Sequence, residues 1–304
     1  VQQAERMLSD LRAKARLHEF LLTWLNLNRE RDLSKDPEAF PGFDEHAIAD
    51  LRTSLELFLD DVLWSEGADF RRLLLDEDVF LNDRLAKFYA SQVNADEGFS
   101  KVEFDDGARA GVLTHPYLMA SLSDRRQSSP IHRGVLLARG VLGVSLRPPP
   151  VAVAPIAADL HPNLSTRERV TLQTKPKECM TCHGIINPLG FTLERFDAIG
   201  RIREADRGKP IDDSGSYRTR SGQTVEMTGP RSLGEMLAGS EEVHVSFTEQ
   251  LFHHLVQQPV RAYGPETLNT LRQAFVEQEM NIRKLAVEVM AASALVGRDP
   301  VRGS

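Results

Sequence analysis

The sequence predicts a mainly α protein, in which a helical N-terminal domain is followed by a second helical domain that contains a small β-hairpin. Three observations lead to this prediction. Apolar residues recur at helical spacing through much of residues 1–147. A proline-rich stretch at 148–164 then interrupts this pattern and predicts an extended connector. A stretch rich in Gly, Ser and Thr at 212–229 holds the hairpin pattern between the helical segments of 165–300.

In the N-terminal domain, apolar stripes alternate with polar breaks. The predicted helices lie at 4–27, 44–65, 69–90 (in shorter pieces) and 135–146. Asp44 is the expected N-cap of the second helix, because a short acidic side chain accepts hydrogen bonds from free backbone N–H groups. The leucines and aromatic residues of these segments are expected to form core rather than a binding surface.

In the second domain, Ser165 or Thr166 is expected to cap the first helix. Pro188 is expected to end the next helix, because proline lacks the N–H that a helix interior needs. The hairpin is predicted to pair 215–217 with 223–225. Further helices are predicted at 232–239, 243–257 and 266–294.

Length and charge limit the classes of protein that fit. The 304 residues correspond to roughly two domains. A net charge of −7 and the lack of a basic face or tail argue against a nucleic-acid partner. No run approaches the ~18 uncharged apolar residues of a membrane span, so no transmembrane segment is predicted. Residues 301–304 resemble the remnant of an expression tag, and the fold prediction leaves them out.

The string Cys-Met-Thr-Cys-His at 179–183 is the most specific pattern in the chain. Cys179 and Cys182 are the only cysteines, and His183 follows directly. This spacing is the attachment signature of a c-type haem. On a helix, positions i, i+3 and i+4 share one face, so both thiols and the imidazole can meet one haem. One covalently bound haem c is predicted, with Cys179 and Cys182 as thioether residues and His183 as the proximal iron ligand.

The cysteine pair has three other interpretations. A disulfide between Cys179 and Cys182 would close a very small, strained loop and add little stability. A thioredoxin-like redox pair needs a strand-to-helix setting, and the polar residues at 175–178 form no apolar strand. A structural zinc site needs four ligands, and no second cysteine pair supplies them. Haem attachment fits the string better than these three.

The second axial iron ligand decides the chemistry. Methionine there raises the potential and suits electron transfer, whereas an open position permits peroxide or dioxygen chemistry. Met227, in a Gly- and Thr-rich stretch after the motif, is the first candidate. His254 and His115 are further candidates, with a structural role as the alternative for each. Arg195 and Arg203 are candidates for pairing with haem propionates, with ordinary salt bridges as the alternative.

Further strings along the chain carry a family resemblance. They lie at 43–44, 80–86, 129–134, 148–150, 166–169, 187–191, 193–200 and 211–215. With the haem motif, they resemble the planctomycete-type multidomain cytochrome c proteins, whose tandem segments are catalogued as domains of unknown function. The resemblance covers essentially the whole chain. It implies a secreted or periplasmic haem c protein, often attached to further cytochrome or carbohydrate-binding modules.

The leading functional hypothesis is a c-type cytochrome that exchanges electrons with a redox partner protein. Haem attachment to this motif normally follows export, so a periplasmic or secreted location is expected, with the signal peptide upstream of this sequence. The alternative is a haem enzyme, peroxidase-like or oxygenase-like, whose sixth iron position is open or labile. The size of 1–147 supports that alternative, because an electron carrier alone does not need it. A scaffold with a structural haem is a third hypothesis.

Overall fold

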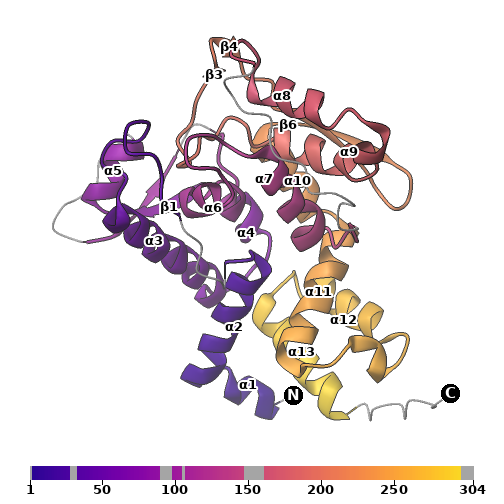
Figure 1. The fold of residues 1–304 in the computed structure, drawn as a ribbon. Helices are drawn as coiled ribbons and strands as arrows, with labels where there is room; N and C mark the ends of the chain where they lie inside the picture. The colour runs from indigo at the N-terminus through magenta and orange to yellow at the C-terminus, as the bar shows by residue number, and fades with distance from the viewer. Residues whose placement is uncertain (1, 28–32, 90–97, 105–106, 147–160, 296–304) are drawn as a thin grey trace.

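The fold is mainly helical, as predicted. A computed structural model describes residues 2–27, 33–89, 98–104, 107–146 and 161–295. In these ranges, three two-stranded antiparallel sheets accompany the helices (Figure 1). No helix in the same ranges is both long and apolar enough to cross a lipid bilayer.

The N-terminal elements follow the predicted pattern with two differences. They are α1 (Gln2–Met7), α2 (Leu11–Trp24), α3 (Glu45–Trp64), α4 (Arg72–Leu75), β1 (Asp78–Leu81), α5 (Asp83–Tyr89) and β2 (Ser100–Glu103). The first predicted helix is interrupted, because Asp10 caps a new helix. Asp44 caps α3 as predicted and accepts a hydrogen bond from the N–H of Ala47 (3.0 Å). The prediction of helices alone at 69–90 is wrong, because β1 pairs with β2.

The elements before the connector pack directly against those after it. They are η2 (Gly111–Thr114), α6 (Pro116–Ser121), α7 (Pro130–Val135) and the π-helical η3 (Leu136–Val141). Ser129 caps α7 and accepts a hydrogen bond from the N–H of His132. The helix predicted from residue 135 therefore begins five residues earlier, at Pro130.

The second half follows the predicted order of helices and hairpin. Its elements are α8 (Thr166–Gln173), α9 (Lys177–Phe191), β3 (Ala205–Asp206), β4 (Lys209–Pro210), β5 (Ser214–Arg218), β6 (Thr224–Thr228), α10 (Gly229–Ala238), α11 (Glu241–Val256), η5 (Val260–Tyr263), α12 (Thr267–Glu277) and α13 (Ile282–Leu295). Ser165 caps α8 in a reciprocal capping box with Glu168. The predicted hairpin is present as β5–β6, but its predicted register is wrong: Gly215 is paired with Met227 and Tyr217 with Val225, because the second strand extends to Thr228.

Two helix predictions in this half are wrong. Helix α9 runs through Pro188 instead of ending there. The missing N–H removes only the helical hydrogen bond to the carbonyl of Gly184. The single helix predicted at 266–294 is two helices, α12 and α13. Glu279 and Met280 both have a φ of 57°, which an α-helix does not accommodate.

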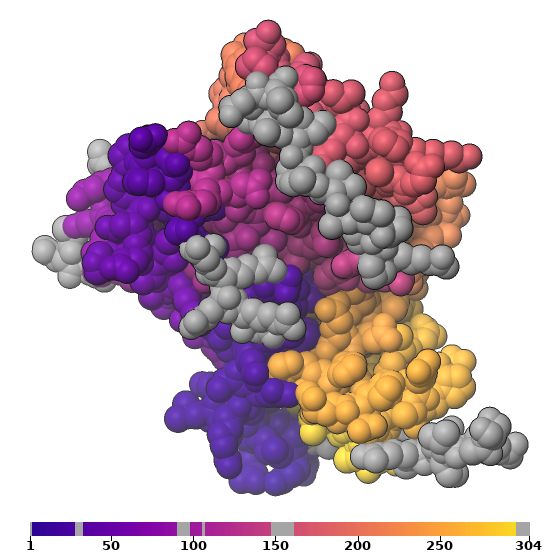
Figure 2. Space-filling view, in the orientation of Figure 1, coloured from indigo at the N-terminus to yellow at the C-terminus, as the bar shows by residue number. Residues whose placement is uncertain are grey.

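One hydrophobic core takes side chains from both sides of the connector. Phe70 and Phe247 lie with ring centroids 4.6 Å apart in this core. A smaller cluster packs around α3, β1 and α5. Figure 2 shows the N-terminal helices against the C-terminal helices at the lower end of the molecule. Most of the connector, 148–160, and residues 301–304 lie outside the described ranges, so the domain boundaries stay a prediction.

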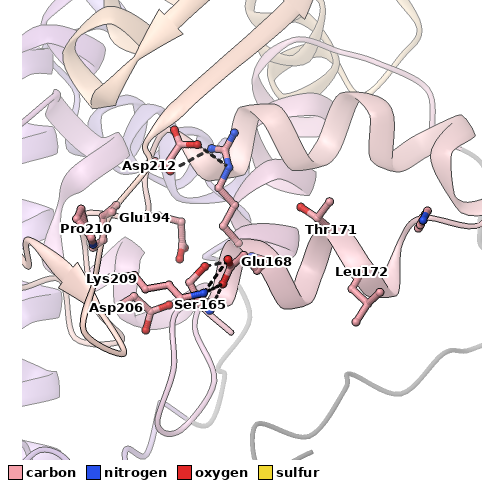
Figure 3. Close-up of a pocket in the computed structure, with 12 residues that line it drawn as sticks. Ser165, Glu168, Thr171, Leu172, Glu194, Asp206, Lys209, Pro210 and Asp212 are labelled. Carbon is pink, nitrogen blue, oxygen red and sulfur yellow. Dashed lines mark hydrogen bonds and ion pairs between the residues drawn. The ribbon is translucent and has the colours of Figure 1, made fainter. Parts of the chain in front are cut away.

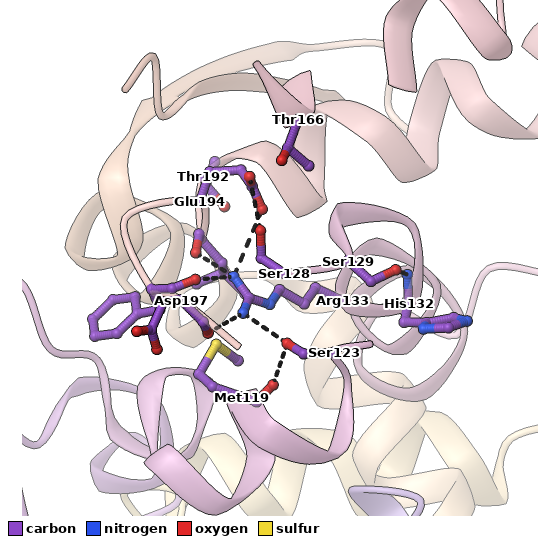
Figure 4. Close-up of polar contacts among 12 residues, drawn as sticks. Met119, Ser123, Ser128, Ser129, His132, Arg133, Thr166, Thr192, Glu194 and Asp197 are labelled. Atoms are coloured by element: carbon purple, nitrogen blue, oxygen red, sulfur yellow. Dashed lines mark hydrogen bonds and ion pairs between the residues drawn. The ribbon is translucent and has the colours of Figure 1, made fainter. Parts of the chain in front are cut away.

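A buried arginine joins α7 to the segment after α9 (Figure 4). Nη1 of Arg133 donates to the carbonyl oxygens of Leu193 (2.7 Å) and Phe196 (2.8 Å). Nη2 donates to the carbonyl oxygen of Asp197 (2.9 Å). Burial lowers the pKa of Arg133 to about 10 and raises the pKa of Glu194, whose carboxylate is 3.7 Å away. These acceptors compensate the buried charge and fix α7 against the end of α9.

Candidate haem site

Helix α9 carries Cys179, Cys182 and His183 on one face. It is continuous from Lys177 through the motif, so these three positions lie on adjacent turns of the same side. Both cysteines are free thiols, and all three side chains are partly exposed. Among the described residues, no group of three or more His, Cys, Asp or Glu side chains is placed to hold a bare metal ion. The candidate site is therefore the face of α9 that carries the two thiols and the imidazole.

A chain of hydrogen bonds behind His183 determines which ring nitrogen is free. The hydroxyl of Thr174 donates to the carbonyl oxygen of Val170 (2.8 Å), which can only accept. Nδ2 of Asn187 therefore donates to Thr174 Oγ1 (2.8 Å), and Asn187 Oδ1 faces Nδ1 of His183 (2.8 Å). Because Oδ1 can only accept, Nδ1 of His183 carries a hydrogen, which leaves the lone pair of the neutral ring on Nε2. The ring nitrogen of His183 that is left to bind a metal is therefore Nε2.

The second half of α9 is buried, whereas its first half is exposed. Gly134 packs on Ile186, and Gly190 packs on Pro130, so closely that a Cβ on either glycine would overlap a backbone carbonyl oxygen. Asn187 is 6% exposed. The motif thus stands on a fixed helix with its thiols and imidazole accessible from solvent. This arrangement of donors fits the covalent attachment of a haem.

Met227 lies on the other side of α9 from the thiols. It is 3% exposed, belongs to the main core, and pairs with Gly215 of β5. Gly215 packs against the backbone carbonyl of Pro188. Pro188 follows Cys179 by nine residues, about two and a half helical turns, so it faces the opposite way. The hairpin therefore covers the face of α9 away from the motif.

His115 and His254 are held by other contacts. In His115, Nδ1 accepts from the N–H of Tyr117 (3.3 Å), and Nε2 is 3.2 Å from Oγ of Ser54. Burial, helped by the charge of Arg109, lowers the pKa of His115 to about 3. Nε2 of His254 is 3.2 Å from a carbonyl oxygen of α2, and burial lowers the pKa of His254. His115 is thus held by α3 and α6, and His254 by α2. The choice of the distal iron ligand stays a prediction.

The two candidate propionate partners form salt bridges. Arg195 pairs with Glu204, and Arg203 pairs with Glu194 (3.1 Å) and Asp206 (3.4 Å). In the structure these two arginines therefore make ordinary salt bridges, which was the alternative to pairing with haem propionates.

The sequence prediction missed Asn187 and Thr174. Asn187 follows His183 by four residues, one helical turn, and this spacing is the signal that would have found it. The residue before a proline disfavours the helical conformation, so the expected end at Pro188 left Asn187 outside the helix and hid that signal. Thr174 belongs to the segment after α8, and no local pattern predicts its contact with α9.

An open cavity of about 620 Å³ lies beside α8 (Figure 3). Glu168 and Lys209 form an ion pair at its wall (2.6 Å), and Arg167 pairs with Asp212 (3.2 Å). Arg167, Glu168, Thr171 and Leu172 of α8 line it, and so does Lys175, the residue after Thr174. Cys179, Cys182 and His183 are not among the residues that line this charged cavity.

Two family models match the chain. Residues 1–90 match PSD4, described as a protein of unknown function (DUF1592), and residues 109–206 match PSCyt3, described as a protein of unknown function (DUF1588). The second match contains α7, α8 and all of α9. No curated protein and no solved structure gave a significant match. The two stretches are therefore similar to one domain of each of these families, the domain types that the resemblance to planctomycete-type cytochrome c proteins leads us to expect.

Proposed function

We propose that this chain is a c-type cytochrome that holds one haem covalently and exchanges single electrons with a redox partner protein outside the cytoplasm. The observation that supports this proposal best is the shared face of α9, with two free thiols and an imidazole whose Nε2 has a lone pair. The family matches agree with it. A bound haem supplies a one-electron iron couple at this face.

The two cysteines and the histidine of the motif each have a defined role in this proposal. Cys179 and Cys182 would hold the haem, each by adding its thiol across one vinyl group. Each addition would place Sγ on one vinyl carbon and the thiol hydrogen on the other, so that no electrons are gained or lost overall. His183 would offer its Nε2 lone pair to the iron while Asn187 holds Nδ1. The exposed first turns of α9 leave this face accessible to a partner protein.

A second function is favoured by the positions of the distal candidates. In the described part of the chain, Met227 lies across α9 from the motif, and the rings of His115 and His254 make hydrogen bonds elsewhere. An open sixth position would permit peroxidase-like or oxygenase-like chemistry. This arrangement makes the haem enzyme the alternative to the electron carrier.

Haem attachment is tested by expressing the chain with an export signal and a cytochrome c maturation system. The wild type should retain haem on a denaturing gel, and the double variant Cys179→Ala, Cys182→Ala should lose it. Thr181→Ala is the matched control, because Thr181 is exposed on the opposite side of the same helix. A wild-type protein without covalent haem would overturn the proposal.

Carbon monoxide separates the two functions. A low-spin ferrous spectrum that carbon monoxide leaves unchanged supports electron transfer through iron with two protein ligands. High-spin iron that binds carbon monoxide readily supports the enzyme and overturns the electron carrier.

A further inference from the structure

The hydrogen-bond chain behind His183 runs from one helix to the next. It begins at His183 Nδ1, passes through the side chains of Asn187 and Thr174, and ends at the carbonyl oxygen of Val170 in α8. Each of its three links measures 2.8 Å. Asn187 and Thr174 are 6% and 3% exposed. The chain is therefore a buried connection between the imidazole and the backbone of α8.

We infer that Asn187 and Thr174 are positioning residues for the iron ligand, which fix the orientation and tautomer of the His183 imidazole and set how strongly it donates to iron. This inference rests on the proposed haem attachment.

The carbonyl group of Val170, at the end of the chain, determines which group donates in each of the three hydrogen bonds. A backbone carbonyl has no proton, so the hydroxyl of Thr174 must donate to Val170. That hydroxyl then has only lone pairs left for Asn187, which must direct Nδ2 toward it. A reversed amide or a flipped imidazole would leave a buried polar group without a partner, which is unfavourable. Thr174 thus controls the orientation of Asn187, and Asn187 controls that of His183.

The identity of residue 187 also sets the strength of the ligand. An acceptor on Nδ1–H draws the proton away from the ring and makes Nε2 a better donor. The neutral amide of Asn187 does this less than a carboxylate would and more than an apolar side chain would. A stronger donor stabilises ferric relative to ferrous iron, so the acceptor at 187 tunes the reduction potential.

The reduction potential of the holoprotein is the first test. Asn187→Asp should lower it and Asn187→Leu should raise it, each by about tenfold in the redox equilibrium constant, or about 59 mV for one electron. Thr174→Val keeps the shape of the side chain but removes its hydroxyl, and it should shift the potential. Thr174→Ser keeps the hydroxyl, and its potential should equal the wild-type value. Thr181→Val, on the exposed side of α9, is the control and should leave the potential unchanged.

The tautomer of His183 is the second test, and it needs no haem. In the ¹⁵N-labelled full chain without haem, at a pH where imidazoles are neutral, His183 should be in the Nδ1–H form. Thr174→Val should give a mixture of both tautomers. An unchanged tautomer and unchanged potentials in all folded variants would overturn the inference. Absence of covalent haem from the wild type, with the tautomer effects intact, would instead refute haem attachment alone.

Discussion

Gly134 of α7 lies against Ile186 of α9 at a distance that leaves no room for a side chain. A Cβ on Gly134 would overlap the carbonyl oxygen of Ile186. Glycine permits this approach because it has no Cβ. Ile186 is three residues after His183, so this contact holds the helix that carries the motif.

Gly134→Ala should destabilise the protein by about 1–3 kcal/mol, because the two helices must move apart. Chemical denaturation measures the loss. Gly184→Ala is the matched control, since a Cβ there meets only Cε of Met180 at 3.9 Å. This control should be neutral or more stable by about 0.5–1 kcal/mol, as expected for alanine in a helix. Equal stability of both variants would show that the helices can separate without cost.

Replacing the buried Arg133 should destabilise the protein strongly. Arg133→Met leaves Glu194 without one of its two nearby cations and three carbonyl groups without their donor. Removing one partner of a buried ion pair costs about 3–5 kcal/mol, and urea unfolding should report this loss. Arg126→Met is the control, because that arginine forms an exposed pair with Asp36, and its stability should stay near the wild-type value. A similar small effect of both variants would contradict a compensating role for Arg133.

Acid should destabilise the protein through His115. Its folded pKa of about 3 lies below the ordinary value of 6.5. The unfolded chain therefore binds more protons between these pH values, so this contribution to stability is full above pH 6.5 and falls as the pH drops below it. Between pH 6.5 and 5.5 the free energy of unfolding should fall by about 1 kcal/mol from this group. His115→Asn keeps a helix-capping side chain without a titrating ring, and its pH slope should be smaller; equal slopes would refute the assignment.

Met227→Leu should leave the visible spectrum of the haem-loaded protein unchanged. The hairpin that carries Met227 packs on the side of α9 opposite the thiols. Leucine has a similar volume, so the core should accept it with little loss of stability. Loss of a sulfur–iron absorption feature would show instead that Met227 reaches the iron, and would support the electron carrier.

The parts of the fold with local signals could be predicted from the sequence. Asp44 and Ser165 cap the helices that follow them, because capping depends only on residues within one turn. The hairpin lies where its turn residues predict it. The placement of Cys179, Cys182 and His183 on one helix face follows from their spacing alone.

Other features depend on contacts between distant segments, and the sequence pattern missed them. Strand β1 exists through its pairing with β2, about twenty residues later. Helix α9 passes through Pro188 because α7 and β5 pack on its second half. The link from Asn187 to Thr174 joins α9 to the turn after α8, which no single-helix pattern reveals.

The contacts of Arg133 and Gly134 join the segments before and after the connector without using the connector itself. Arg133 and Gly134 precede the connector, whereas their partners Ile186, Leu193 and Asp197 follow it. Covalent linkage through 148–160 is therefore not what holds these segments together. A chain nicked there by a protease should elute as one noncovalent complex and separate into two fragments only when unfolded. The haem motif would then remain in place on a helix whose support comes largely from the other fragment.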